Sequence, residues 1–190
     1  MRLLTTGFET FGGFSENPTE LLMLEIQKGK IPLPTQLEVR AVVLPVTFRQ
    51  AYQELEKNIQ EFRPELVLAF GLAVGRSSID LERVAINCIN AEIADNEGYR
   101  PVERKINPQG PDAYFSTLPI TQLAQALNEN GFRSSVSNTA GTYVCNYLFY
   151  RLMETAKLSD IRGGFIHVPG RDSLAPEELL QAWSVMVRNL

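Results

Sequence analysis

One stretch of the chain has the residue types and spacing that build a cysteine nucleophile. Residues 135–150 read SVSNTAGTYVCNYLFY, a short strand followed by a small-residue turn and a helix that places Val144 and Leu148 on one face. Cys145 then lies in the first helical turn, where free N–H groups and the positive end of the helix dipole stabilise a thiolate. The same N–H groups could hold an oxyanion. This stretch therefore predicts a site for attack on a carbonyl carbon.

A lone cysteine among apolar neighbours is more often a small buried hydrophobic residue, so other residues must decide between the two interpretations. The sequence contains one histidine, His167, and any Cys–His catalysis must use it. One histidine also rules out zinc sites with two or three His ligands, and no CxxC is present. We expect no metal and no cofactor. The second cysteine, Cys88, is interpreted as structural, since the two cysteines form no disulfide framework.

Composition limits the class of protein and its partners. The 190 residues are 44% hydrophobic, which fits a single globular domain over residues 1–190. The net charge is -4, with acidic and basic residues interspersed, which argues against binding to nucleic acid or an anionic membrane. No signal peptide and no apolar run of transmembrane length is present. We therefore expect a cytoplasmic protein in a reducing compartment.

Strands and helices alternate along the chain, and the elements that must position the nucleophile follow from this pattern. The alternation predicts an α/β fold: one three-layer αβα sandwich with a mostly parallel, twisted sheet. The run ELVLAFGLA is apolar on both faces, as is typical of a central parallel strand. A helix capped by Asn17 should bury Leu21, Leu22, Leu24 and Ile26. Strands are expected at 2–6, 37–48, 65–73, 83–93 and 163–169, and further helices at 48–62, at 119–130 and from 176 onward.

The residues that could do chemistry converge at one edge of this sheet. Sites in such folds lie beyond the carboxyl ends of the strands. Four features meet there: the aromatic loop FETFGGF, the loop leading to Glu82, the turn before Cys145, and His167 near a strand end. A nucleophile, a base and a carboxylate form a catalytic triad. The phenylalanines of the loop have two interpretations, an apolar pocket wall or a plug of the core.

The chain resembles the type I pyroglutamyl peptidases, also called pyrrolidone-carboxylate peptidases, over almost its whole length. The resemblance implies a cytoplasmic cysteine omega-peptidase that removes an N-terminal pyroglutamyl residue from peptides and often forms homo-tetramers. It implies that Cys145 is the nucleophile, that His167 is the general base and leaving-group acid, and that Glu82 orients His167. The matching segments are TGFETFGGFSENP, GRSSIDLERVAIN, ADNEG, STLPI, NTAGTYVCNYLFY and RGGFIHVP.

The resemblance also implies a substrate pocket, and the chain departs from the family pattern beside it. Leu72 stands where the family usually has a pocket glutamine, and Glu92 where it usually has an arginine. The tail beyond Pro169 is shorter than usual. These departures leave the nucleophile machinery intact and leave two alternatives open: a different N-terminal acyl specificity, or a non-catalytic binding relative. The residues that match the lactam pocket are Phe8, Phe11, Asn17 and Val144, with Leu72 at the substituted position.

Overall fold

The computed structural model describes residues 1–29, 34 and 36–190. Five helices and eight strands run through the described residues in an order close to the expected alternation. In chain order they are β1 (Arg2–Phe8), α1 (Pro18–Gln27), β2 (Glu38–Leu44), α2 (Phe48–Phe62), β3 (Leu66–Leu72), β4 (Ile79–Glu82), β5 (Val84–Ile86), β6 (Ala113–Phe115), α3 (Ile120–Glu129), β7 (Ser134–Ser137), α4 (Val144–Ser159), β8 (Arg162–Val168) and α5 (Pro176–Arg188).

The main sheet is mixed and mostly parallel, which confirms the predicted fold class. Its strand order is β2-β1-β3-β8-β4-β7. Every neighbouring pair is parallel except β4 and β8, which are antiparallel. β3 lies between two parallel partners and is buried on both faces, as its continuous apolar run predicts. β5 and β6 form a separate antiparallel pair.

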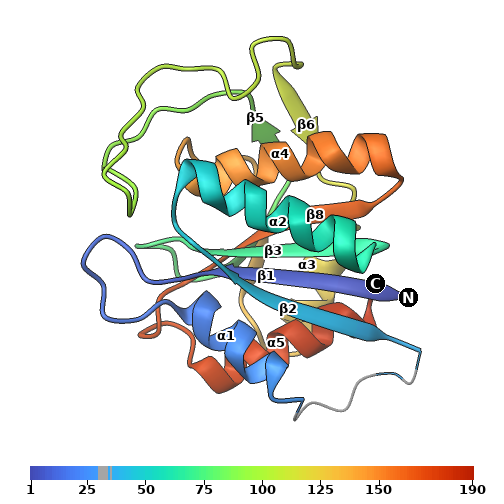
Figure 1. Ribbon diagram of the computed structural model, residues 1–190. Helices are drawn as coiled ribbons and strands as arrows, with labels where there is room; N and C mark the ends of the chain where they lie inside the picture. The colour runs from blue at the N-terminus through green and yellow to red at the C-terminus, as the bar shows by residue number, and fades with distance from the viewer. Residues whose placement is uncertain (30–33, 35) are drawn as a thin grey trace.

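Helices cover both faces of the sheet and make the predicted three layers (Figure 1). α2 and α4 pack together on one face, and α1, α3 and α5 pack on the other. The β5–β6 pair lies outside α4, on the same side of the sheet. Each interface has its own apolar core, one containing Phe149 and Phe165, the other Phe70 and Trp183. Both faces of the sheet are thus buried, and a functional site can form only where the strands end.

The sequence prediction was wrong for residues 79–86. We expected a loop through Glu82 and then one strand over 83–93, but the structure has β4 in the main sheet and β5, which ends at Ile86, in the antiparallel pair with β6. Ile79 and Leu81 are buried on one face of β4, while Asp80 and Glu82 are buried on the other. Asp80 and Glu82 made this segment look like a loop, because charged side chains are rarely buried; here Arg76 nearby and Ser135 and His167 from distant strands satisfy them.

Smaller differences concern which side chains face the core. α1 is capped by Asn17 as predicted and buries Leu22, Met23 and Ile26. Leu24 was expected inside but is 41% exposed, because it lies on the opposite side of the helix from this face. β2 ends at Leu44 rather than reaching 48.

None of the helices within the described residues is long and apolar enough to cross a lipid bilayer. Among the same residues, no three or more His, Cys, Asp or Glu side chains gather in a group that could hold a metal ion.

Candidate active site

A small cavity of about 130 Å³ lies where β1, β3 and β8 end and α4 begins. The structure brings seven of the eight predicted site residues together in its lining, and the eighth, Glu82, lies directly behind His167. The sequence reasoning had not named the other three lining residues as site residues: Val46 and Ala140 are small or apolar loop residues, and Tyr143 is the residue before the first turn of α4. The lining consists of Phe8, Phe11, Asn17, Val46, Leu72, Ala140, Tyr143, Val144, Cys145 and His167.

Cys145 is placed by the contact between the start of α4 and the middle of the sheet. Tyr143 caps the helix with an extended backbone and Val144 is its first residue, so Cys145 lies in the first turn as predicted. A Cβ atom added at Gly71 of β3 would lie 2.8 Å from the Cys145 sulfur and 2.8 Å from a ring carbon of Phe165. Position 71 therefore has room for a glycine and for no larger residue, and this lets the sulfur rest against the sheet.

His167 and Glu82 meet across the antiparallel pair β4–β8. The register sets His167 opposite Asp80, so Glu82, two residues further along, lies diagonally across on the same face. The His167 Nδ1 to Glu82 Oε1 distance is 2.7 Å, and both side chains are buried. A proton on Nδ1 donated to this carboxylate leaves Nε2 as the basic nitrogen of the ring. The histidine is thereby prepared to take a proton in the cavity.

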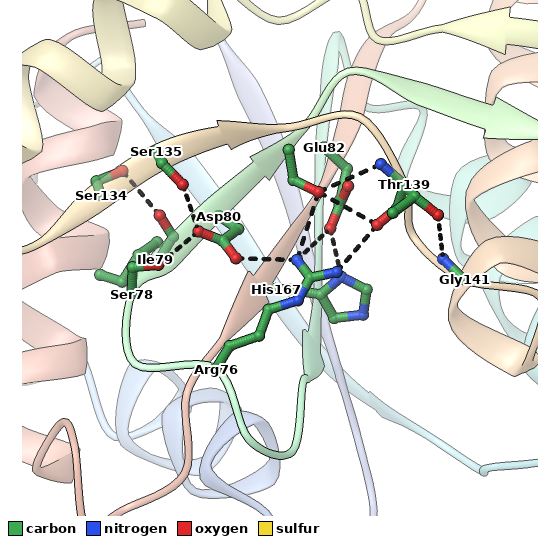
Figure 2. Close-up of polar contacts among 11 residues, drawn as sticks. Arg76, Ser78, Ile79, Asp80, Glu82, Ser134, Ser135, Thr139, Gly141 and His167 are labelled. Carbon is green, nitrogen blue, oxygen red and sulfur yellow. Dashed lines mark hydrogen bonds and ion pairs between the residues drawn. The ribbon is translucent and has the colours of Figure 1, made fainter.

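The sequence reasoning missed an ionic network behind this pair (Figure 2). One guanidinium nitrogen of Arg76, Nη1, donates to Glu82 Oε1 at 2.8 Å and to Asp80 Oδ2 at 2.9 Å. The other, Nη2, donates to the backbone oxygen of Thr139 at 3.0 Å. A signal was present in the sequence RSSIDLE, because acidic residues two apart on a strand share one face and the arginine precedes them within reach.

The thiol itself behaves differently from the sequence expectation. The pKa of Cys145 is raised to about 12, mainly by burial and also by the charge of Glu82, against the smaller lowering effects of Arg76 and a backbone N–H. A backbone N–H favours the thiolate, as the helix start predicts, but desolvation of the sulfur is the larger effect. Attack by Cys145 therefore needs a base that removes the thiol proton during the reaction, and His167 lines the same cavity.

Aromatic rings give the cavity its apolar wall. Phe8 is buried at the end of β1 and packs near Phe165, with ring centroids 6.5 Å apart. Phe11 is half-buried and faces Tyr143 at 6.3 Å. Phe14, the third phenylalanine of the loop, is 46% exposed and does not line this cavity. The two earlier interpretations of the loop are thus both correct in part: Phe8 plugs the core and also forms the wall.

The Asn17 side chain makes hydrogen bonds within the protein. Asn17 Oδ1 accepts from the Thr19 N–H at 3.0 Å, and its Nδ2 donates to the Glu9 backbone oxygen at 2.9 Å. Asn17 thus fixes the loop after β1. Leu72 presents an apolar side chain to the cavity. Glu92 is exposed and Cys88 half-buried, and neither belongs to the lining.

Comparisons with known proteins agree on one family. A model of the family described as pyroglutamyl peptidase matches residues 1–182. The pyrrolidone-carboxylate peptidase of Thermococcus litoralis is 37% identical over 190 residues, 99% of this chain and 83% of that protein. That of Halalkalibacterium halodurans is 44% identical over 178 residues, 92% of this chain and 87% of that protein. Among solved structures, a mutant pyrrolidone carboxyl peptidase from Pyrococcus furiosus has a TM-score of 0.92 at 38% identity, covering 99% of this chain and 97% of that one. Pyroglutamyl peptidase I from Bacillus amyloliquefaciens has a TM-score of 0.91 at 34% identity, covering 99% and 93%.

Proposed function

The chain belongs to the pyroglutamyl peptidase family, and we infer from this membership that it is a cysteine peptidase that removes an N-terminal pyroglutamyl residue from peptides. We further propose that Cys145, His167 and Glu82 carry out the reaction. The observation that supports these roles is that Cys145 and His167 line the same cavity, while Glu82 Oε1 is hydrogen-bonded to Nδ1 of His167 at 2.7 Å.

Acylation begins when the Cys145 sulfur attacks the pyroglutamyl carbonyl carbon and its proton passes to His167 Nε2. The first N–H groups of α4 have no partner within their own helix and stabilise the negative charge that develops on the carbonyl oxygen. His167 then gives its proton to the departing amine as the C–N bond breaks, which leaves a thioester on Cys145. Glu82 holds the imidazole in the tautomer that these steps require.

Deacylation returns the enzyme to its starting state. Water attacks the thioester carbonyl while His167 Nε2 takes one of its protons. The C–S bond breaks, the proton returns to the sulfur, and free pyroglutamate leaves. His167 thus passes on each proton that it accepts, first to the departing amine and then to the Cys145 sulfur.

Pyroglutamyl recognition rests on an apolar pocket with backbone hydrogen bonds. The lactam ring packs on Phe8 and Phe11, and Val144 and Leu72 close the pocket. Asn17 Oδ1 is taken by Thr19 and one N–H of Nδ2 by the Glu9 backbone oxygen, so backbone groups and the second N–H of Asn17 are left for the polar contacts of the lactam. A small apolar cavity without a charged side chain facing the ring suits a neutral cyclic acyl group better than a free amino terminus.

The direct test is release of aminocoumarin from a pyroglutamyl-aminocoumarin amide. The wild-type chain should hydrolyse this substrate, Cys145→Ser should not, and Cys88→Ser, the matched control outside the cavity, should retain most activity. Far-ultraviolet circular dichroism confirms that each variant is folded. Full turnover by Cys145→Ser would refute the assignment of the nucleophile, and a wild-type chain inactive on this amide would refute the function.

Assembly and compartment are part of the same proposal. The family resemblance favours a homo-oligomer, with a tetramer as the expected form, and several large apolar side chains such as Leu158 and Phe115 are exposed on the single chain. Both cysteines are free, which fits a reducing, cytoplasmic setting. Light scattering on the purified protein measures the mass of the assembly, and a monomer at micromolar concentration would contradict the oligomer.

A further inference from the structure

Arg76 joins the two halves of the candidate active site. Figure 2 shows its guanidinium lying between the acidic face of β4 and the loop that leads to α4. Nη1 donates to Glu82 Oε1, and Nη2 donates to the backbone oxygen of Thr139. Thr139 in turn accepts from the Gly141 N–H through its hydroxyl at 3.1 Å, inside the turn that precedes Cys145. One side chain thus contacts both the carboxylate behind His167 and the turn before the nucleophile.

Glu82 needs such a partner because of where it lies. Its side chain is fully buried, and its second oxygen, Oε2, has no hydrogen-bond partner within the described residues. Burial of a carboxylate disfavours its charged form unless a cation or several donors compensate. Compensation falls on Oε1, which receives Arg76 Nη1 at 2.8 Å and His167 Nδ1 at 2.7 Å. The imidazole contributes one hydrogen bond, and Arg76 provides the compensating charge.

Arg76 is itself held in place by a second buried carboxylate. Asp80 Oδ2 accepts from Nη1 at 2.9 Å, while Asp80 Oδ1 accepts from the hydroxyls of Ser78 and Ser135, each at 2.7 Å. Burial alone lowers the pKa of Arg76, but its hydrogen bonds and charge contacts with Glu82 and Asp80 raise it above the usual value. The guanidinium therefore keeps its charge and its orientation.

We propose that Arg76, anchored by Asp80, is a positioning residue that compensates the charge of the buried Glu82 carboxylate and keeps it directed at His167. The inference rests on the proposed catalytic roles of Cys145, His167 and Glu82. Arg76 touches no reacting atom and acts through the carboxylate. Its removal should lower kcat with little change in KM, because the interaction that is lost matters after the substrate has bound.

The decisive experiment is a double-mutant cycle with Arg76→Met and Glu82→Gln. Each single variant should lower kcat, Arg76→Met by roughly 10- to 100-fold, the range expected when a buried charge loses its charged hydrogen-bond partner. The double variant should be about as slow as Glu82→Gln alone, because Arg76 has nothing to act on once the carboxylate is gone. If Arg76→Met lowers kcat by the same factor in both backgrounds, the proposal is wrong.

A pH profile distinguishes positioning from a purely structural role. Glu82 is faced by Arg76 and Asp80, by His167 from β8 and by Cys145 from α4. A buried carboxylate that loses its cation binds a proton more readily, so the acidic limb of kcat/KM should move to higher pH in Arg76→Met. An unchanged limb together with a lower unfolding temperature and normal kcat would overturn the proposal in favour of a structural role.

Two further variants serve as controls for the substitution of Arg76. Arg76→Lys keeps the charge but cannot reproduce the contact from Nη2 to Thr139, so its kcat should fall between those of wild type and Arg76→Met. It also carries the test if Arg76→Met does not fold, and a Lys variant as slow as Met would overturn the charge argument. Arg40→Met is the matched control. It removes a guanidinium of β2 that pairs with Glu61 of α2 at the surface, and it should leave kcat unchanged. The wild-type and Glu82→Gln rates test the proposed function independently of Arg76.

Discussion

Substitution of Gly71 by alanine should damage both the stability and the catalysis of this enzyme. A Cβ at this position would lie 2.8 Å from the Cys145 sulfur and 2.8 and 2.9 Å from two ring carbons of Phe165. Real Cβ contacts are essentially never this short, so one of the three groups must move. Phe165 is fully buried beneath α4, and Gly71 lies on β3 between β1 and β8. Phe165 has no free space to take up the displacement, so the Cys145 sulfur, which borders the cavity, is the group that must shift.

The expected loss of stability follows from forcing a methyl group into a packed core. Such insertions destabilise proteins by about 1–3 kcal/mol. For a chain of this size, each kcal/mol lowers Tm by roughly 2–4 °C, so Gly71→Ala should melt about 2–12 °C below the wild type. The sulfur should also shift by several tenths of an ångström, and a misplacement of about 1 Å at a reacting atom can lower the rate about 100-fold. We therefore expect kcat to fall by roughly tenfold or more.

Two other glycines serve as controls in the same chain. A Cβ at Gly163 on β8 would meet its nearest atom, a backbone oxygen of Val67, at 3.2 Å, so Gly163→Ala should be milder. A Cβ at Gly170 would have nothing within 4 Å, and Gly170→Ala should be close to neutral. Thermal unfolding and hydrolysis of the pyroglutamyl amide measure both quantities. If Gly71→Ala matches Gly170→Ala in Tm and kcat, the sulfur does not rest against Gly71 and our description of the site is wrong.

Two further predictions concern the pocket and the thiol. Leu72→Gln should lower KM for pyroglutamyl amides with little change in kcat, because the added hydrogen bond strengthens binding of substrate and transition state equally. Glu92→Arg, the control outside the cavity, should leave KM unchanged. Equal KM values for Leu72→Gln and wild type would place residue 72 away from the substrate. Burial raises the pKa of Cys145 to about 12, so in a Cys88→Ser background its alkylation by iodoacetamide should accelerate from about pH 7 to about pH 10. Glu82, Arg76, His167 and Tyr143 are the ionisable groups around it, and a plateau below about pH 9 would contradict the burial argument.

Several elements could be predicted from local sequence because their signals are local. α2 runs over Phe48–Phe62 as its apolar periodicity predicts, with Thr47 as the cap. The turn at Gly141 has a positive φ of 75°, which glycine adopts readily, so the strand–turn–helix unit around Cys145 was recognisable. His167 stands near the end of a strand as expected, and being the one histidine of the chain it was the one candidate base.

The thiol shows the limit of local reasoning. Cys145 lies in the first turn of α4 as predicted and a backbone N–H there lowers its pKa, but the larger effect of burial was not visible in the sequence. A helix terminus is a local feature that the sequence displays. Desolvation depends on Phe165 and the strand beneath, which arrive from distant parts of the chain, and the electrostatic penalty of burying the sulfur exceeds the local stabilisation.

The sequence by itself determined the layers of this protein and the types of its reactive groups. Hydrophobic periodicity, helix caps and turn residues act over a few neighbouring positions, so they can be recognised in the sequence alone. The tertiary structure alone decided that β4 runs antiparallel beside β8, which sets Glu82 diagonally across from His167. Strand pairing depends on groups that are far apart in sequence, and no local pattern records that β8 will bring His167 to Glu82 or that β7 will bring Ser135 to Asp80. Arg76 is close to both acidic residues in sequence, but only the pairing of β4 inside the sheet buries them and makes its charge necessary.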